Sequence, residues 1–284
     1  MRLMSFSTGA TASYGVVNGD GVVDLGRRLG GRYPTLRSLL AGGEAALAEA
    51  RGLAGHAPDH ALSAVTFLPV VPDAGKIIGI GLNYKSHVTE GAGREPPPFP
   101  RVFSRWNDTL LGHGQPMQRP KVSTHFDYEG ELAVIIGKGG RHIPAASAMQ
   151  HVAGYSIFHD GSVRDWQKQT TTSGKNFFAS GPFGPWMVTA DEIPDYTRLT
   201  LTTRVNGEQR QHASLSELIY TIPVLIEYCS KIAPLEPGDV IATGTPEGVA
   251  SYRNPPAWLV PGDTVEIEIP GIGILRNPVI AEPN

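Results

Sequence analysis

The sequence has little that is typical of a secreted, membrane-spanning or nucleic-acid-binding protein. Its 284 residues include a single cysteine, Cys229, so an internal disulfide and a multi-cysteine zinc site are both excluded. No segment approaches the roughly 18 apolar residues of a membrane helix, and the first residues lack the apolar run of a signal peptide. The formal net charge of −3 predicts no basic surface for nucleic acid or an anionic membrane. We therefore expect a cytoplasmic protein that binds small molecules.

Charged residues are also few, at 18% of the chain, whereas hydrophobic residues make up 40%. This balance excludes a disordered chain and predicts a compact protein with a core. The 34 glycines and 24 prolines show no collagen-like period, so we interpret them as turns between short strands. The length favours roughly two domains, or one large domain with a small appendage.

The first part of the chain reads as a small module. The turn-forming quartet Asn18–Gly21 separates two apolar segments and predicts a hairpin within residues 1–26. Apolar residues at helical spacing then predict one or two helices over Thr35–Leu53. Prolines and a glycine follow, and we place a domain boundary near residue 70. This gives a small N-terminal domain over 1–70 and a main domain over 71–284.

The main domain alternates turn signals with β-rich segments, so we expect a mainly β protein with helices, of the α+β class. One substantial helix is expected over Ser214–Ala233, with Pro223 interrupting its pattern. The proline-rich segment Gly91–Pro100 is expected to be an exposed loop. The expected strands are Glu131–Ile136, Gly154–Phe158, Trp186–Val188, Leu199–Val205, Asp239–Thr243 and Thr264–Ile269.

Two carboxylates stand at the start of an apolar strand. Glu129 and Glu131 are two residues apart, so their side chains point to the same side. Such a pair is unfavourable unless it stays in water or shares a cation, and carboxylate oxygens suit Mg²⁺, Mn²⁺ or Ca²⁺. Asp160 follows another strand-like segment, beside His159 as a further candidate ligand. A solvated strand end and a helix N-cap at Asp160 are the simpler alternatives.

A further polar cluster occupies Asn83–Glu90. If this segment is helical, His87 and Glu90 are three residues apart on one face, and the carboxylate can orient the imidazole as a general base. An exposed pair on a short surface helix is the alternative interpretation. Arg164 and Asp165 have a simple interpretation too, as a salt-bridged pair on the surface.

Together these segments resemble the fumarylacetoacetate hydrolase superfamily, and within it the acylpyruvate and fumarylpyruvate hydrolases. Seven motifs spread over about residues 70–280, in the family's order, carry the resemblance. They are N-Y-x-x-H-x-x-E (Asn83–Glu90), D-Y-E-G-E-L-A-V-I-I-G (Asp127–Gly137), D-x-S-x-R-D-x-Q (Asp160–Gln167), G-K (Gly174–Lys175), G-P-F-G-P-W (Gly181–Trp186), V-N-G-E (Val205–Glu208) and G-D-V-I-A-T-G-T-P-E-G-V (Gly238–Val249).

The resemblance implies a fold and a set of site residues. The catalytic domain would consist of β-sheets rolled together like a barrel, preceded by a small N-terminal α/β domain, and the protein would form a homodimer. The metal ligands, for Mg²⁺ or Mn²⁺ and with Ca²⁺ as a further candidate, would be Glu129, Glu131 and Asp160. The catalytic residues would be His87 and Glu90 on a lid, and Lys175. The residues that hold substrate oxygens would be Gln167, Gly244 and Thr245.

The chain departs from the family pattern near the lid and the pocket. Where many members have a lysine in F-x-K-x-x-S, Arg105 stands here, and we predict that it binds substrate. An arginine can pair bidentately with a distal carboxylate, which favours a diacid substrate. The residues expected to shape the pocket are Arg94, Arg101, Arg105, Phe177 and Phe178.

The function that the resemblance implies is hydrolysis of a C–C bond in a 2,4-dioxo acid through a metal-stabilised enolate. The metal would hold the 1-carboxylate and 2-oxo oxygens, His87 would activate water, and Lys175 would stabilise developing negative charge. Relatives with the same metal ligands also act as decarboxylases, isomerases or hydratases on oxaloacetate or related 2-oxo acids of aromatic-acid catabolism. A metal-binding protein without catalysis is the remaining alternative.

Overall fold

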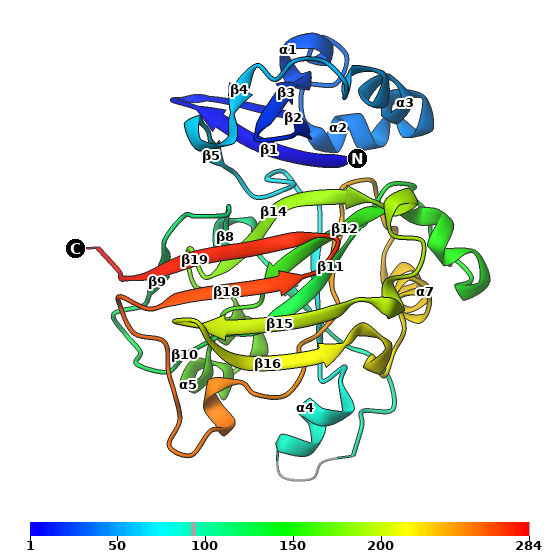
Figure 1. Cartoon of the computed structure of the whole chain (residues 1–284). Helices are drawn as coiled ribbons and strands as arrows, with labels where there is room; N and C mark the ends of the chain where they lie inside the picture. The colour runs from blue at the N-terminus through cyan, green and yellow to red at the C-terminus, as the bar shows by residue number, and fades with distance from the viewer. Residues whose placement is uncertain (92–94, 284) are drawn as a thin grey trace.

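Strands dominate the structure, a computed structural model that describes residues 1–91 and 95–283 (Figure 1). The strands are β1 (Arg2–Thr8), β2 (Thr11–Asn18), β3 (Gly21–Asp24), β4 (His60–Ala61), β5 (Thr66–Phe67), β6 (Ile77–Gly81), β7 (Arg101–Arg105), β8 (Leu110–Leu111), β9 (Met117–Arg119), β10 (Phe126–Asp127), β11 (Gly130–Ile136), β12 (Val152–His159), β13 (Ser162–Val163), β14 (Gly181–Thr189), β15 (Thr200–Val205), β16 (Glu208–Ser214), β17 (Val240–Ala242), β18 (Thr264–Ile269) and β19 (Gly273–Ala281). The α-helices are α1 (Leu25–Leu29), α2 (Leu36–Ala41), α3 (Gly43–Leu53), α4 (Lys85–Glu90), α5 (Arg164–Gln167), α6 (Thr171–Lys175) and α7 (Ile222–Ile232).

Within the described ranges the strands form one large sheet, one of five strands and one short pair. The large sheet follows the order β4-β3-β2-β1-β14-β12-β11-β17-β6-β7, with β5 beside β1 and β8 beside β14. The second sheet runs β16-β15-β18-β19-β9, and β10 pairs with β13. In Figure 1 the five-stranded sheet lies across β11, β12 and β14, and strands of the two sheets are in contact. The expected α+β fold with a dominant sheet is confirmed.

The N-terminal elements follow their predicted patterns. Strands β2 and β3 form the expected hairpin, with Asn18 opposite Gly21 and with Gly19 at a positive φ of 57° in the turn. The segment Thr35–Leu53, over which one or two helices are expected, contains two, α2 and α3. Thr35 caps α2, because its side chain accepts a hydrogen bond from the amide of Ser38.

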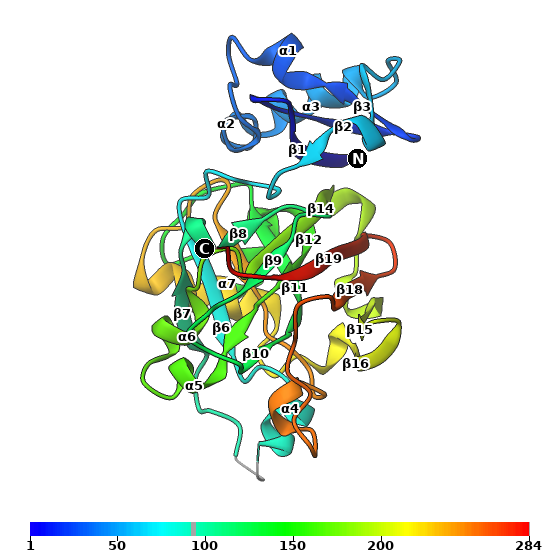
Figure 2. The same ribbon diagram turned by 90° about the vertical axis from the view of Figure 1, so that its left-hand side faces the viewer.

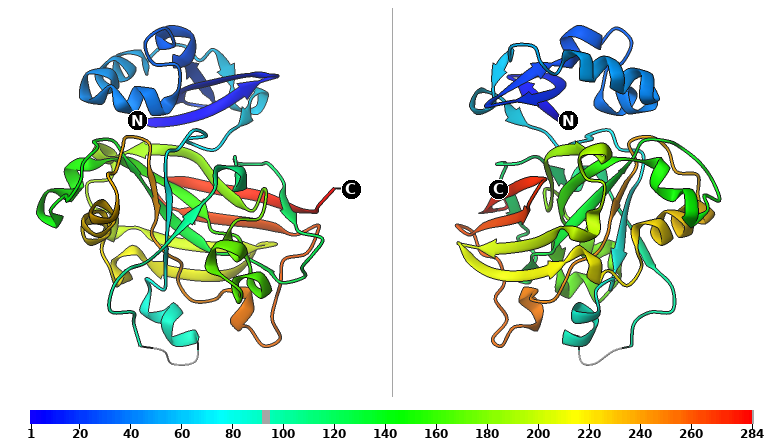
Figure 3. Two further views of the ribbon diagram at one scale, coloured as in Figure 1. Left: turned by 180° about the vertical axis from the view of Figure 1, so that it is seen from behind. Right: turned by 45° about the vertical axis from the view of Figure 1, so that its right-hand side comes forward.

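Strand β1 joins this N-terminal part to the rest of the molecule. It pairs antiparallel with β14, with Arg2 opposite Val188 and Leu3 opposite Met187. Side chains of both parts share one hydrophobic cluster, in which Leu39 of α2 is buried together with Ile135 of β11. The N-terminal elements lie at the end of the molecule opposite α4, as Figures 2 and 3 show. The boundary near residue 70 stays a prediction.

The six strands expected in the main domain are all present, five of them within two residues of their predicted ends, whereas the strand expected over Trp186–Val188 begins five residues earlier. They correspond to β11, β12, β14, β15, β17 and β18. Apolar residues fill the space between the sheets, and the largest cluster combines residues of β11 and β12 with residues of β15 and β18. This core holds the ends of β11 and β12 in place, which matters for the site described below.

The helix predicted over Ser214–Ala233 is wrong in its first half. Ser214 ends β16, a 3-10 turn covers residues 215–217, and α7 begins only at Ile222. Pro223 explains the difference, because proline lacks a backbone N–H and fits only the first turn of a helix. Asn83 also fixes the residues before the helix, since its side chain accepts from the Tyr220 amide (2.7 Å) and donates to the Tyr220 carbonyl (3.1 Å).

The helices are short, and the longest described ones, α3 and α7, have 11 residues each. Across residues 1–91 and 95–283, no helix combines the length and apolar character needed to cross a bilayer.

Replacing Ile135 by Ala should destabilise the protein by about 2–5 kcal/mol, because it leaves a cavity in the shared hydrophobic cluster. Ile135 is fully buried between the strands of Gly154 and Val240. The matched control is Ile232→Ala, since Ile232 is 60% exposed and its loss should change stability by no more than about 0.5 kcal/mol. Urea-induced unfolding followed by circular dichroism measures both. Equal losses would contradict the packing described here.

Candidate active site

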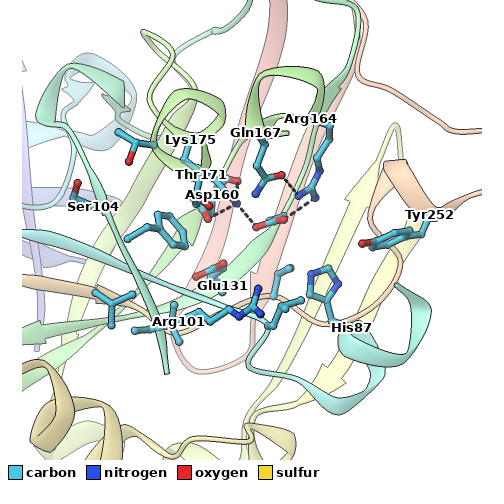
Figure 4. A pocket seen from close by; sticks show the side chains of 18 residues that line it. His87, Arg101, Ser104, Glu131, Asp160, Arg164, Gln167, Thr171, Lys175 and Tyr252 are labelled. Carbon is cyan, nitrogen blue, oxygen red and sulfur yellow. Dashed lines mark hydrogen bonds and ion pairs between the residues drawn. The ribbon is translucent and has the colours of Figure 1, made fainter. Parts of the chain in front are cut away.

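A cavity of about 540 Å³ is the place where most of the predicted site residues meet (Figure 4). Its wall combines residues of β6, β7, α4, α5 and α6 with residues that border β11 and β12. The predicted residues that line it are His87, Glu129, Glu131, Asp160, Gln167, Lys175 and Thr245.

Antiparallel pairing of β11 with β12 brings the three predicted metal ligands together. Glu131 lies opposite Phe158, and two residues further along the ladder the Asp160 amide donates a 2.9 Å hydrogen bond to the carbonyl of Glu129. Each of the three carboxylates offers an oxygen within 4.8 Å of the others, and all three side chains are buried. Glu129 and Glu131 thus share a side, as their spacing predicts.

The surroundings of Glu131 and Glu129 shift the pKa values of these two carboxylates in opposite directions. Burial and repulsion from Asp160 and Glu129 raise the pKa of Glu131 well above its usual range. Burial also acts to raise the pKa of Glu129, but the positive charges of Lys175 and Arg164 outweigh it, and the pKa of Glu129 lies below its usual range. Among the described residues, no cation forms an ion pair with Glu131, although Lys175 acts on its carboxylate from further away.

The residues fit a divalent cation. Oxygen-only ligands in a buried cluster suit Mg²⁺ or Mn²⁺. Four carboxylates gather here against three cationic side chains, which leaves one uncompensated negative charge if all are ionised. The carboxylates are Asp127, Glu129, Glu131 and Asp160, and the cations are Arg105, Arg164 and Lys175.

Lys175, at the end of α6, points into the carboxylate cluster. Its Nζ donates to Glu129 Oε2 at 2.5 Å and to a carboxylate oxygen of Asp160. The ammonium also lies 5.4 Å from the centre of the Phe103 ring, within range of a cation–π contact. This position lets it donate a hydrogen bond to an oxygen held at the same cluster.

Arg164 is a site residue that the sequence analysis did not identify. Its guanidinium donates to Asp127 (2.7 Å), Glu129 (2.6 Å) and Gln167 (2.9 Å), and it lines the cavity. The proposed surface pair of Arg164 with Asp165 is therefore wrong. The motif D-x-S-x-R-D-x-Q contains the arginine and Gln167, but only the fold shows that its carboxylate partners come from β10 and from the residue just before β11.

His87 and Glu90 form the pair that their spacing predicts. Both lie on α4, and His87 Nδ1 is 2.6 Å from Glu90 Oε1. The second oxygen of Glu90 accepts a 2.8 Å hydrogen bond from the Gly248 amide, which fixes the carboxylate. His87 is buried and lines the cavity, so the exposed surface pair considered above is wrong. In Figure 4 the imidazole lies across the cavity from Lys175, beside Tyr252.

The structure does not bring Arg105 into the cavity wall. Its buried guanidinium donates to Asp160 Oδ1 (2.7 Å), the Gly161 carbonyl (2.9 Å) and Ser180 Oγ (3.1 Å). Direct substrate contact, which the sequence predicts for Arg105, does not fit this placement. Arg105 instead lies behind Asp160 and holds that carboxylate. The N-cap considered for Asp160 is also wrong, because the side chain pairs with Arg105 and Lys175 and a strand residue follows.

Of the other predicted substrate-binding residues, two line the cavity and one does not. Gln167 and Thr245 line the cavity, and Thr245 Oγ1 accepts a hydrogen bond from Gln211 (2.8 Å). Gly244 is not part of the wall, and its amide donates to Glu131 (2.8 Å), so it contacts a predicted metal ligand. Its φ of +103° and the 2.7 Å from a built Cβ to the Asn83 side chain explain the glycine.

Of the described residues expected to shape the pocket, apart from Arg105 discussed above, only one is found in the cavity wall. Arg101 lines the cavity, and Arg94 lies outside the described residues. Phe177 and Phe178 border a different hollow, next to Trp166. His159 is buried, and burial lowers its pKa to about 3, but its ring nitrogens have no hydrogen-bond partner among the described residues and it is not part of the carboxylate cluster.

Comparison with known proteins agrees with this geometry. Residues 76–280 match the family described as fumarylacetoacetate (FAA) hydrolase, C-terminal. The chain is 40% identical over 266 residues to a mitochondrial oxaloacetate tautomerase, Fahd2a, of Rattus norvegicus, which covers 92% of this chain and 85% of that protein. It is 43% identical over 225 residues to the oxaloacetate tautomerase YisK of Bacillus subtilis (strain 168), covering 78% and 75%.

A solved structure is similar over the whole chain. The crystal structure of maleylpyruvate hydrolase from Sphingobium sp. SYK-6, in complex with manganese(II) and pyruvate, matches with a TM-score of 0.84 and 30% identity and covers 100% of both chains.

Mn²⁺ should raise the melting temperature of metal-stripped wild-type protein and should not raise that of Glu131→Gln. A ligand that binds only the folded state stabilises it by about 2.7 kcal/mol at 100 times its Kd, and loss of one of three carboxylates weakens that binding. Differential scanning fluorimetry with a Mn²⁺ titration measures the shift. Glu44→Gln, on the exposed start of α3, is the control and should respond like wild type. An unchanged response in Glu131→Gln would exclude Glu131 as a ligand.

Proposed function

This chain belongs to the fumarylacetoacetate hydrolase family, and we propose that it is a divalent-metal-dependent enzyme that catalyses keto–enol tautomerisation of oxaloacetate. The arrangement that supports a reaction of this kind most strongly is the His87–Glu90 pair, which lies across one cavity from the carboxylate cluster and Lys175. The choice of reaction rests on the similarity to oxaloacetate tautomerases, which extends over 92% of the chain in the rat protein.

Tautomerisation transfers a proton between C3 of the substrate and the oxygen on C2. A divalent cation held by Glu129, Glu131 and Asp160 would stabilise the negative charge that forms when C3 loses its proton. Lys175 lies beside the same carboxylates and can donate a hydrogen bond to the C2 oxygen as its charge grows. Arg164 holds Glu129 and Gln167 in place, so these groups need not reorganise during the reaction.

His87 is the group that exchanges the proton at C3. Glu90 holds Nδ1, which leaves Nε2 to face a ligand in the cavity. Glu90 is itself fixed by the Gly248 amide, so the imidazole keeps its orientation. A neutral imidazole can remove a proton from C3 of the keto form and leave the enolate, whose C2 oxygen takes up a proton from solvent to give the enol while the imidazolium gives its proton up to solvent. The reverse steps convert the enol to the keto form, with the imidazolium returning the proton to C3.

Hydrolysis of a C–C bond in a 2,4-dioxo acid, the reaction that the sequence predicts, is the second candidate. The similarity to maleylpyruvate hydrolase over the whole chain favours it. The same residues would serve, because His87 would then take a proton from water instead of from C3, and Lys175 would again stabilise the oxygen on C2. The two reactions therefore differ in what lies next to His87, and substrate shape decides between them.

Metal-stripped protein assayed with and without Mn²⁺ or Mg²⁺ tests the proposed function. Tautomerisation appears as loss of the ultraviolet absorbance of enol oxaloacetate, above the uncatalysed rate. We expect this activity to depend on metal. Pyruvate release from acetylpyruvate or fumarylpyruvate would instead support hydrolysis, and pyruvate with CO₂ from oxaloacetate would indicate decarboxylation. Absence of all three activities would contradict the proposed function and would point to an isomerase or hydratase substrate, or to a metal-binding protein without catalysis.

Replacing His87 by Ala should lower kcat about 10²- to 10⁴-fold, the usual contribution of a general base. Metal binding should persist, because His87 is not part of the carboxylate cluster. The Mn²⁺-dependent rise in melting temperature is therefore the control for an intact site. A variant that keeps the wild-type kcat would rule out His87 as the proton-exchanging group.

A further inference from the structure

Three cationic side chains line the cavity, and they differ in their partners. Lys175 pairs with Glu129 and Asp160, and Arg164 pairs with Asp127 and Glu129. Arg101 also lines the cavity, but its guanidinium has no hydrogen bond or ion pair to any residue among 1–91 and 95–283. In Figure 4 its side chain points into the cavity. Of these three, Arg101 is thus the one whose charge is free to pair with a ligand.

Strand β7 places Arg101 at a defined distance from the carboxylate cluster. Arg101, Phe103 and Arg105 alternate along the strand and share a face. Phe103 lines the cavity next to Lys175, and Arg105 contacts Asp160 from behind the wall, so this end of the strand lies at the inner end of the cavity. Arg101 and Arg105 are four residue steps apart in extended chain, or about 13 Å between their Cα atoms.

Glycines on the neighbouring strand give this row of side chains its space. In the β6–β7 ladder Gly79 lies opposite Phe103, and Gly81 lies opposite Arg101. A Cβ on Gly79 would come within 2.3 Å of the Phe103 ring, so the ring lies directly over the glycine. The face of β6 next to Arg101 likewise carries no side chain, which leaves the arginine room to reach into the cavity.

A dicarboxylic 2-oxo acid has a negative charge that the inner end does not accommodate. We place its 1-carboxylate and C2 oxygen next to the metal ligands and Lys175. The cationic side chains at this end, Lys175 and Arg164, are already paired with carboxylates of the protein, so they are not available for a second substrate carboxylate. The second carboxylate must lie further out, and burying it without a partner is costly. A guanidinium can bind it with two parallel hydrogen bonds.

We propose that Arg101 determines specificity by binding the distal carboxylate of a dicarboxylic 2-oxo acid. This inference rests on the proposed function, because it takes the inner end of the cavity to hold the 2-oxo acid group. It assigns Arg101 the role of direct carboxylate recognition in place of Arg105, whose guanidinium is occupied with Asp160. A 2-oxo acid with a neutral group at the same position leaves Arg101 unused and is a poorer substrate.

Matched substrates that differ only in the distal charge test this assignment. For tautomerisation the two substrates are oxaloacetate and its 4-methyl ester. For hydrolysis they are fumarylpyruvate, which has a distal carboxylate, and acetylpyruvate, which has an uncharged methyl group instead. The variants are Arg101→Gln, which removes the charge, and Arg101→Lys, which keeps it without the bidentate geometry. Arg141→Gln is the control, because Arg141 is exposed and does not line the cavity.

In the reaction that the wild type catalyses, Arg101→Gln should lower kcat/KM for the diacid about 10- to 100-fold, mostly through KM, in line with the loss of a charged hydrogen bond. The uncharged substrate should keep its wild-type kcat/KM, Arg101→Lys should restore part of the loss, and Arg141→Gln should match wild type. Equal losses on both substrates, or no loss on the diacid, would overturn the assignment while the proposed function stands. A wild type inactive on every substrate would instead refute the proposed function, and the inference with it.

Discussion

The pairing of β11 with β12 is the constraint on which the site depends. It places three carboxylates in one buried volume, an arrangement that is unfavourable for an isolated protein because like charges lose hydration and repel. The surrounding structure offsets this in two ways. Lys175 and Arg164 neutralise Glu129, and Arg105 neutralises Asp160 from behind. Glu131 is left without such a partner, which is the physical reason why the cluster suits a bound cation.

The cavity has an inner and an outer part with different chemical tasks. Cations and carboxylates that hold each other line the inner part, so its geometry is fixed before a ligand arrives and suits charge stabilisation. The outer part consists of α4 with His87 and of the first residues of β7, where side chains have fewer partners. Proteins with the same inner part can therefore differ in reaction and substrate through the outer part. The similarity of one chain to both tautomerases and a hydrolase is consistent with this division.

The sequence predicted those parts of the site that depend on local spacing. Glu129 and Glu131 share a strand face, and His87 and Glu90 share a helix face, because each pair lies within one element. Contacts between distant elements cannot be predicted in this way, so the sequence leaves a surface pair open for Arg164. It also predicts that Arg105 binds substrate, because nothing in the local pattern shows that Asp160, which follows β12, is its partner. The same applies to the helix over Ser214–Ala233, where Asn83 and Pro223 hold the first residues in another conformation.

The pairing of β1 with β14 has a consequence for how the chain folds as it is synthesised. Leu3 and Met187 are neighbours in the sheet, so the first strand leaves the ribosome long before its partner exists. Until then the β1–β2 hairpin has an open edge and the N-terminal helices lack part of the surface that they cover. Such long-range strand pairing slows folding and exposes unpaired edges to other chains. We therefore expect β1 to pair with β14 late, after the strands that precede β14 in the chain have been synthesised.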